Sequence, residues 1–86
     1  MKKEYLNELF ELFPSLQTAG EAESFLRDLL TPHEINQVAE RWQIVKGISE
    51  GKSQRKVKEE LGVSIEKVTR GAKALRASKG GFNLFL

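Results

Sequence analysis

The sequence has no cysteine, a single histidine and no long apolar run. Without cysteine the chain forms no disulfide, and a lone histidine is not enough for a zinc site, so we expect no metal. No stretch approaches the length of about 20 apolar residues that crosses a bilayer, and the first residues lack the pattern of a signal peptide. We therefore expect a cytoplasmic protein.

The groups of residues that catalysis requires are also missing. The sequence shows no pairing of a nucleophile with a base, no phosphate-binding loop and no metal-binding cluster. We therefore expect no enzyme, no catalytic residues and no catalytic cofactor. His33 is expected to be an exposed polar residue in the first turn of a helix.

The chain is short, at 86 residues, and fits one small domain. A domain of this size buries a modest part of its surface and is marginally stable alone. Since neither a disulfide nor a metal is expected, association with another chain is the remaining way to enlarge the core.

Charge is divided unevenly along the chain. Residues 1–40 carry three bases against eight acids, a net −5, whereas residues 41–86 carry eleven bases against four acids, a net +7. A basic half is typical of proteins that bind a polyanion such as nucleic acid. An uneven solvated surface remains the alternative from charge alone.

Apolar residues recur at three- and four-residue steps, whereas the alternation typical of strands is absent. The pattern predicts an all-α fold with about five helices. They cover residues 3–13, 19–29, a third segment from Pro32 to the turn at Gly51, 54–61 and 65–75. Residues 77–86 are too short and glycine-rich for a helix to be expected.

Two helix starts carry the capping-box pattern, in which a hydroxyl and a carboxylate three residues later bind free backbone amides. Thr18 and Glu21 mark one start, and Thr31 and Glu34 mark the other. Gly51 is expected to end the third helix because glycine tolerates the backbone of a helix C-cap.

Residues 54–73 fit a helix-turn-helix motif. Val57 and Leu61 lie one helical turn apart and are expected to face inward. Gly62 occupies the sharp turn, where glycine tolerates a left-handed backbone. Ser64 follows as the cap of the next helix, whose first amides can donate to its hydroxyl.

Three more side chains complete this prediction. Val63 is expected to fill the corner between the two helices, and Val68 to face back toward the first one. Lys58 stands where most such motifs have a small residue. It indicates either a looser helix crossing or a lysine that extends outward toward phosphate. The second helix of such a motif enters the major groove of DNA.

Aromatic residues outside this motif are few. Trp42 lies on the apolar stripe of the third helix and is expected in a dimer core. Ile44 lies off that stripe, which predicts that this helix buries a wide face. Phe82 and Phe85 are expected to pack onto a partner chain or onto the core.

Several strings of residues resemble the Trp repressor family over residues 30–76. They are Leu30-Thr-Pro-His-Glu34, Arg41-Trp-Gln-Ile-Val45, Ser53-Gln-Arg55, Glu60-Leu-Gly62 and Thr69-Arg-Gly71. The family also has a lysine at the place of Lys58.

The resemblance implies a single-domain chain that forms an intertwined homodimer with a C-terminal helix-turn-helix. Residues 1–51 would form the helical dimerisation core, 53–76 the reading head and 77–86 a short tail. The implied function is a sequence-specific DNA-binding transcriptional repressor, with L-tryptophan as corepressor and a palindromic double-stranded operator.

The same resemblance implies an effector site between core and reading head. Arg41 matches the arginine that pairs with the ligand carboxylate, and Arg70 matches the one that stacks on the indole, both suitable for a guanidinium. Gly71 matches the glycine that leaves room beside the ring. The ammonium group would be received by backbone of the other chain, at Leu29, Leu30 and Thr31.

The resemblance also implies DNA-binding residues on both helices of the motif. They are Gln54, Arg55, Lys58, Ile65, Glu66, Lys67, Thr69 and Arg76. Arg55 suits a guanine edge, Lys67 and Thr69 suit phosphates, and Glu66 suits a cytosine amino group.

Three alternatives stay open at this point. In the first, the chain is a Trp-repressor-like DNA-binding regulator with a different effector or none. In the second, it is a dimerisation module whose basic helices contact acidic protein. In the third alternative, Arg41 and Arg70 are ordinary surface or ion-pair arginines.

Overall fold

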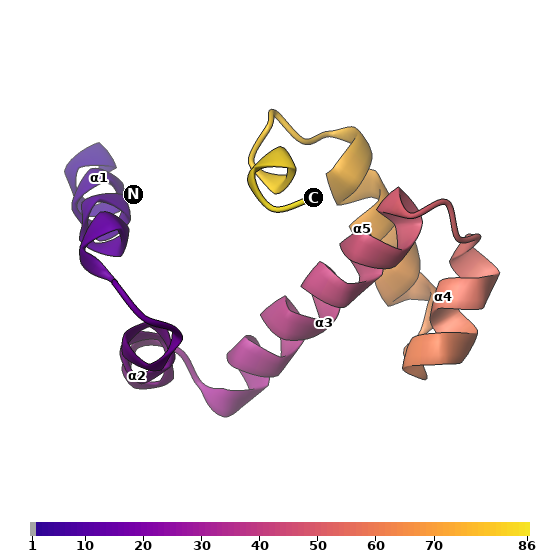
Figure 1. Cartoon of the computed structure of the whole chain (residues 1–86), viewed down its shortest axis with the longest axis horizontal. Helices are drawn as coiled ribbons and strands as arrows, with labels where there is room; N and C mark the ends of the chain where they lie inside the picture. The colour runs from indigo at the N-terminus through magenta and orange to yellow at the C-terminus, as the bar shows by residue number, and fades with distance from the viewer. Residues whose placement is uncertain (1) are drawn as a thin grey trace. The chain divides into compact units, whose positions relative to one another are not determined.

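A computed structural model describes residues 2–86, and within them the chain is entirely helical, without a strand (Figure 1). The α-helices are α1 (Lys3–Leu12), α2 (Ala19–Leu29), α3 (Pro32–Ser49), α4 (Gln54–Leu61) and α5 (Ile65–Arg76), and short 3₁₀ helices cover Phe13–Ser15 and Phe82–Leu84. The predicted all-α class and the five predicted helices are confirmed. The intertwined dimer stays a prediction.

Contacts divide the chain into two compact units, one ending at Ile35 and the other comprising Asn36–Leu86. We call them the N-terminal unit and the C-terminal unit. The predicted boundary at residue 51 separates the expected dimerisation core from the expected reading head. The contacts instead assign most of α3 to the unit that contains α4 and α5.

The predicted capping box is complete at the start of α3, whereas at the start of α2 the Glu21 carboxylate binds the N–H of the residue before the cap. Thr18 Oγ1 accepts from Glu21 N at 3.1 Å, while Glu21 Oε1 accepts from Gln17 N at 2.8 Å. At the start of α3, Glu34 N donates to Thr31 Oγ1 at 3.1 Å and Thr31 N donates to Glu34 Oε1 at 2.8 Å. These hydrogen bonds hold the pKa of the Glu34 carboxyl below its usual value.

The end of α3 also follows the prediction. Gly51 has φ +90°, and its N–H donates to the Ile48 carbonyl at 3.0 Å, while Lys52 N–H donates to the Gly47 carbonyl at 3.2 Å. This pair of bonds is the Schellman motif, which needs the left-handed backbone that glycine tolerates. It ends α3 and starts the turn toward α4.

The N-terminal unit contains no buried residue in α1 or in α2. Phe13 packs edge-on against Phe25, with ring centroids 5.8 Å apart. Much of the apolar surface stays exposed, as at Tyr5 (63%), Phe10 (62%) and Leu29 (50%). In a single chain, this unit has apolar faces without a core of its own.

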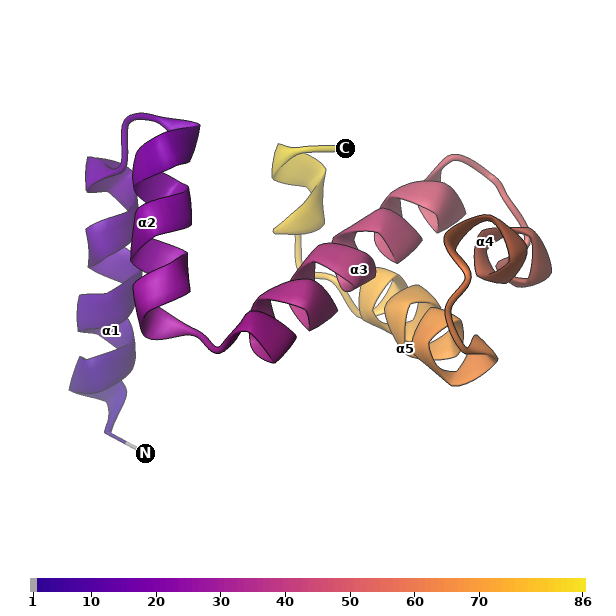
Figure 2. The same ribbon diagram turned by 90° about the horizontal axis from the view of Figure 1, so that it is seen from below.

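The C-terminal unit has a small, closed core. Ile44 of α3, Val57 of α4 and Val68 of α5 are each at most 1% exposed, with Ile48 and Val63 packed against them. Figures 1 and 2 both show α5 lying across α3, with α4 near the C-terminal end of α3. The prediction that α3 buries residues beyond its main apolar stripe is confirmed at Ile44, which is 1% exposed, whereas Val38 on the same helix is 60% exposed.

Two glycines determine how closely the helices of this unit approach. A Cβ on Gly47 of α3 would lie 2.9 Å from Val57 Cγ2, and a Cβ on Gly71 of α5 would collide with the Ile44 side chain. A real Cβ does not tolerate such approaches. The glycines therefore allow the backbone of α3 to approach α4, and α5 to approach α3.

The predicted helix-turn-helix is present as α4, the turn and α5. Gly62 has φ +65°, and its N–H donates to the Lys58 carbonyl at 2.9 Å. Ser64 Oγ accepts from Lys67 N at 3.2 Å and caps α5. Val63 is half-buried in the corner, as predicted.

One detail of the motif differs from the prediction, and a second one decides between two predicted alternatives. Leu61 is 38% exposed, so the prediction that it faces inward was wrong: Val57 alone supplies the buried side chain of α4. Lys58 is exposed. This agrees with the second of the two predicted alternatives, a lysine that extends outward.

The tail folds back on α3 of its own chain. The Phe82 ring stacks on Trp42 with centroids 6.3 Å apart, and Phe85 contacts the same indole edge-on at 6.2 Å. Gly80, with φ +107°, makes the bend that permits this. Trp42, expected in a dimer core, is half-buried by this tail, which forms a 3₁₀ turn where no helix was expected.

Within residues 2–86, no helix has both the length and the apolar character needed to cross a membrane.

Candidate functional site

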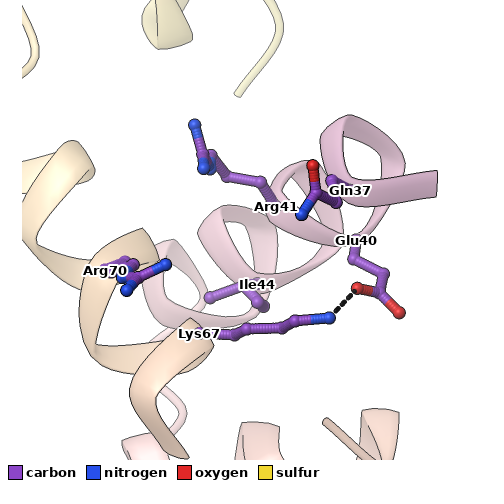
Figure 3. Close-up of a pocket in the computed structure, with 6 residues that line it drawn as sticks. All are labelled: Gln37, Glu40, Arg41, Ile44, Lys67 and Arg70. Carbon is purple, nitrogen blue, oxygen red and sulfur yellow. Dashed lines mark hydrogen bonds and ion pairs between the residues drawn. The ribbon is translucent and has the colours of Figure 1, made fainter. Parts of the chain in front are cut away.

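A pocket lies between α3 and α5 in the C-terminal unit. It is lined by Gln37, Glu40, Arg41, Ile44, Lys67 and Arg70 and has a volume of about 50 Å³. Figure 3 shows Arg41 projecting from α3 and Arg70 from α5, with Ile44 on the side of α3 that faces α5. The structure therefore brings together, along one pocket, the two arginines that were predicted to bind an effector.

Helical spacing explains why these side chains meet. Gln37, Arg41 and Ile44 recur at four- and three-residue steps and share one face of α3. Lys67 and Arg70 are three residues apart on α5 and face the same space. The close crossing at Gly71 brings the two faces together.

The pocket carries three cations and one anion. Lys67 Nζ donates to Glu40 Oε1 at 2.9 Å across its edge, and both side chains are about two-fifths exposed, at 44% and 41%. Within residues 2–86, neither Arg41 nor Arg70 has an ion pair. Two guanidinium groups therefore remain available for an anionic group such as a carboxylate.

Gly71 does not line the pocket. It is buried, and an added Cβ would lie 3.2 Å from Ile44 Cβ and closer still to its methyl group. The position therefore needs a glycine for helix packing. Since Ile44 also forms the pocket floor, Gly71 influences the pocket by setting how far this floor lies from α5.

The third group of predicted effector residues lies in the N-terminal unit, at the end of α2. Leu29 is 50% exposed, Leu30 is half-buried, and Thr31 caps α3. The Thr31 carbonyl accepts from Ile35 N at 3.0 Å. Within residues 2–86 no hydrogen bond to the Leu29 or Leu30 carbonyl is found, so these two oxygens are the free acceptors of the segment.

The predicted DNA-binding residues lie on α4 and α5. Gln54 begins α4, and its Oε1 accepts from Thr69 Oγ1 of α5 at 3.2 Å, which connects the two helices. The Arg55 side chain is 87% exposed and touches Glu59 at 3.3 Å. A contact this exposed is weak and leaves the guanidinium free to bind elsewhere.

The residues predicted on α5 divide between two sides of that helix. Successive residues turn by about 100°, so Ile65, Thr69 and Arg76 share a stripe with the exposed Lys73. We call this the outer stripe. Lys67 lies on the opposite side with Arg70, and Glu66 lies near the edge of the outer stripe.

Sequence reasoning missed three of these features. Lys73 joins the outer stripe, and its spacing of four residues from Thr69 could have identified it. Glu40 and Gln37 line the pocket, and their spacing from Arg41 and Ile44 carries the same kind of signal. The pairing of Glu40 with Lys67 has no local signal, because 27 residues separate them.

A second group of charges connects the α3–α4 turn to α4. Lys52 Nζ donates to Glu60 Oε2 at 2.9 Å, and Lys56 Nζ lies 3.7 Å from Glu60 Oε1. The bond from Lys52 lowers the pKa of Glu60, and the carboxylate in turn raises the pKa of Lys52. This group helps to orient α4.

Comparison with known proteins gives a consistent result. The family described as Trp repressor protein matches residues 4–86. A Trp operon repressor homolog of Chlamydia trachomatis serovar L2 is 38% identical over 82 residues, covering 90% of this chain and 87% of the relative. The homolog of serovar D is 37% identical with the same coverage. The uncharacterized protein YerC of Bacillus subtilis is 28% identical over 81 residues, covering 94% and 78%.

Proposed function

Because the chain belongs to the Trp repressor family and is a Trp-repressor-like regulator, we propose that it is a homodimeric repressor that binds a palindromic double-stranded operator. L-tryptophan is the proposed corepressor. The observation that carries the proposal is the pairing of an outward-facing helix-turn-helix with a pocket that contains Arg41 and Arg70.

The DNA-binding proposal rests on the exposed face of the helix-turn-helix. The outer stripe of α5 carries Thr69, Lys73 and Arg76, and α4 presents Arg55 and Lys58. Helix-turn-helix proteins, the Trp repressor among them, insert the second helix into the major groove. Ile65, at the first position of α5 and 40% exposed, suits contact with a base edge.

Arg55 is the residue we propose to read a base. Its side chain is 87% exposed at the N-terminal end of α4, where a fork of N–H donors can bind guanine O6 and N7. Replacing Arg55 with Ala should weaken binding by about 1–3 kcal/mol at one base position and relax specificity there. An equal loss on specific and random duplexes would refute base reading.

The effector proposal rests on the free guanidinium groups of the pocket. Arg41 suits the carboxylate of an amino acid, and Arg70 suits the face of an aromatic ring over the apolar floor at Ile44. The space within one chain, about 50 Å³, holds only a few water molecules. We propose that the partner's residues 29–31 complete the site.

The dimer proposal rests on the exposed apolar faces of the N-terminal unit. Tyr5, Phe10 and Phe13 are 41–63% exposed, which is costly for a protein that stays monomeric. Charge supports pairing between copies, because residues 1–40 are net acidic and residues 41–86 net basic. Analytical ultracentrifugation of the wild-type chain tests the dimer directly.

The decisive test of the effector is calorimetric titration of L-tryptophan into the purified chain, repeated with Arg70→Ala. We expect binding by the wild type and a loss of at least tenfold in the variant. Arg27→Ala is the matched control, since Arg27 is an exposed arginine of α2 that pairs with Glu23. Absence of heat at millimolar ligand would refute L-tryptophan as the effector.

Salt dependence of duplex binding tests the DNA part separately. Each phosphate that the protein neutralises contributes about −0.9 to the slope of log K against log salt. We expect this slope to be steep. If the basic helices instead bind an acidic protein, the chain should not bind duplex DNA at all.

One observation favours a second candidate, a DNA-binding regulator with a different effector or none. The Lys67–Glu40 ion pair already spans the edge of the pocket and connects α3 to α5 without a ligand. In that case, the affinity for duplex DNA would fall steeply with rising salt concentration and would not change when L-tryptophan is added.

A further inference from the structure

Among residues 2–86, one ion pair joins α3 directly to α5. Lys67 Nζ donates to Glu40 Oε1 at 2.9 Å, across the edge of the pocket (Figure 3). The two residues belong to helices whose mutual orientation decides where the recognition helix points. This contact is therefore placed to influence DNA binding without touching DNA.

The position of Lys67 on α5 supports this interpretation. Its backbone N–H is bound by the Ser64 cap, which fixes the first turn of the helix. Its side chain lies on the pocket side of the helix with Arg70, opposite the outer stripe that carries Thr69. A lysine on that side is directed toward α3 and away from the face proposed to meet phosphates.

The environment of the pair indicates how strong it is. Both side chains are about two-fifths exposed, so the attraction is screened by water and by salt. Such a pair is too weak to hold the helices together, a task that the contact between Gly71 and Ile44 performs. It is strong enough to bias small changes in the orientation of α5.

We propose that Glu40 is a positioning residue for DNA recognition, which sets the orientation of α5 relative to α3 through its ion pair with Lys67. The proposal rests on the DNA binding proposed above. In this proposal Lys67 affects DNA binding through its ion pair with Glu40, and it does not contact a phosphate directly. An effector in the pocket beside the pair would act on the same orientation.

Glu40→Gln separates this proposal from a simple effect of charge. Removing an acidic group from a DNA-binding protein lowers repulsion of phosphate, so charge alone predicts tighter binding. Positioning predicts weaker binding, by about two- to fivefold, as expected for an exposed ion pair. Glu50→Gln is the matched control, since Glu50 follows α3 and lies 3.9 Å from its nearest cation, Lys52.

Lys67→Met tests whether Lys67 contacts phosphate. Methionine keeps much of the aliphatic side chain and removes the ammonium group. A lost phosphate contact would reduce the salt slope by about 0.9. Positioning predicts an unchanged salt slope and a loss of affinity at least as large as that of Glu40→Gln. Combining the two substitutions should cause no further loss of affinity.

The exchanged pair, Glu40→Lys with Lys67→Glu, completes the test. We expect each single reversal to weaken duplex binding and the double reversal to restore it to within twofold of wild type. Tighter binding by Glu40→Gln, a reduced slope for Lys67→Met or a double reversal as weak as Lys67→Glu would overturn the proposal.

A wild-type chain that binds no duplex would refute the proposed function instead. The thermal unfolding of the same variants still tests the pair in that event. Midpoint changes that simply add for Glu40→Gln and Lys67→Met would show that the residues are not coupled, and would overturn the inference.

Discussion

The N-terminal and C-terminal units are of comparable helical content but differ in how they bury apolar residues. In α1 and α2 no residue is buried, whereas Ile44, Val45, Val57 and Val68 are each at most 1% exposed. The C-terminal unit closes a core with helices from its own chain. The N-terminal unit leaves its apolar faces exposed in the single chain. If those faces form the proposed dimer interface, the two units should respond differently to substitution and to protein concentration.

Ile44→Ala should have the largest effect, because it removes the side chain at the centre of the C-terminal core. We expect a loss of about 2–5 kcal/mol in the free energy of unfolding, measured with urea, and a smaller loss of about 0.5–1.5 kcal/mol for Ile44→Val. Equal effects of the two variants would contradict a closed core at this position.

Gly71→Ala should have the next largest effect on stability, since the added methyl group collides with Ile44. Overpacking of this kind costs about 1–3 kcal/mol. Gly20→Ala in α2 is the control, because its added Cβ would lie an ordinary 3.8 Å from Thr18 Oγ1. There alanine should stabilise by about 0.4–1 kcal/mol, so thermal unfolding should show opposite signs in the two units.

Phe10→Ala tests whether the exposed face of the N-terminal unit is an interface. Phe10 is 62% exposed in the single chain, where truncation should change little. In a dimer we expect a tenfold or greater rise in the dissociation constant, about 1.4 kcal/mol or more, measured by sedimentation. An unchanged dissociation constant would exclude Phe10 from the interface, and a monomeric wild type would refute the dimer itself.

The smallest expected effect is on how the stability of the C-terminal unit changes when the pH is lowered. The pKa of Glu60 is lowered from 4.5 in the folded chain by the bond from Lys52. The stability from this bond is present above pH 4.5 and is lost as the pH falls through the lower, folded pKa. Glu60→Gln should therefore lose less stability than wild type between neutral and acidic pH, as measured by unfolding midpoints.

Local signals predicted most of the fold. The hydroxyl and carboxylate pairs at Thr18 and Thr31, and the left-handed glycines at 51 and 62, gave helix ends that agree with the structure to within about two residues. These signals work because each concerns hydrogen bonds among residues close in sequence.

Contacts between distant segments were not predictable in this way. Leu61 was expected inside and is 38% exposed, because the periodicity of an eight-residue helix does not fix how far its face turns toward a neighbour. The stacking of Phe82 on Trp42 and the pairing of Lys67 with Glu40 depend on how the chain folds back. For the pocket, the resemblance predicted Arg41 and Arg70, whereas the role of Gly71 in packing depends on how closely α5 crosses α3 at Ile44.

The contact between Ile44 and Gly71 constrains how the pocket between α3 and α5 could change its shape. The same isoleucine forms the floor of the pocket and fills the space that Gly71 leaves open. A smaller residue at 44 would enlarge the pocket and loosen the helix crossing at once, so a larger pocket would come with altered folding. Gln37, at the rim, is free of that conflict. Changes in the shape of this pocket should therefore arise at the rim, while the floor stays as it is.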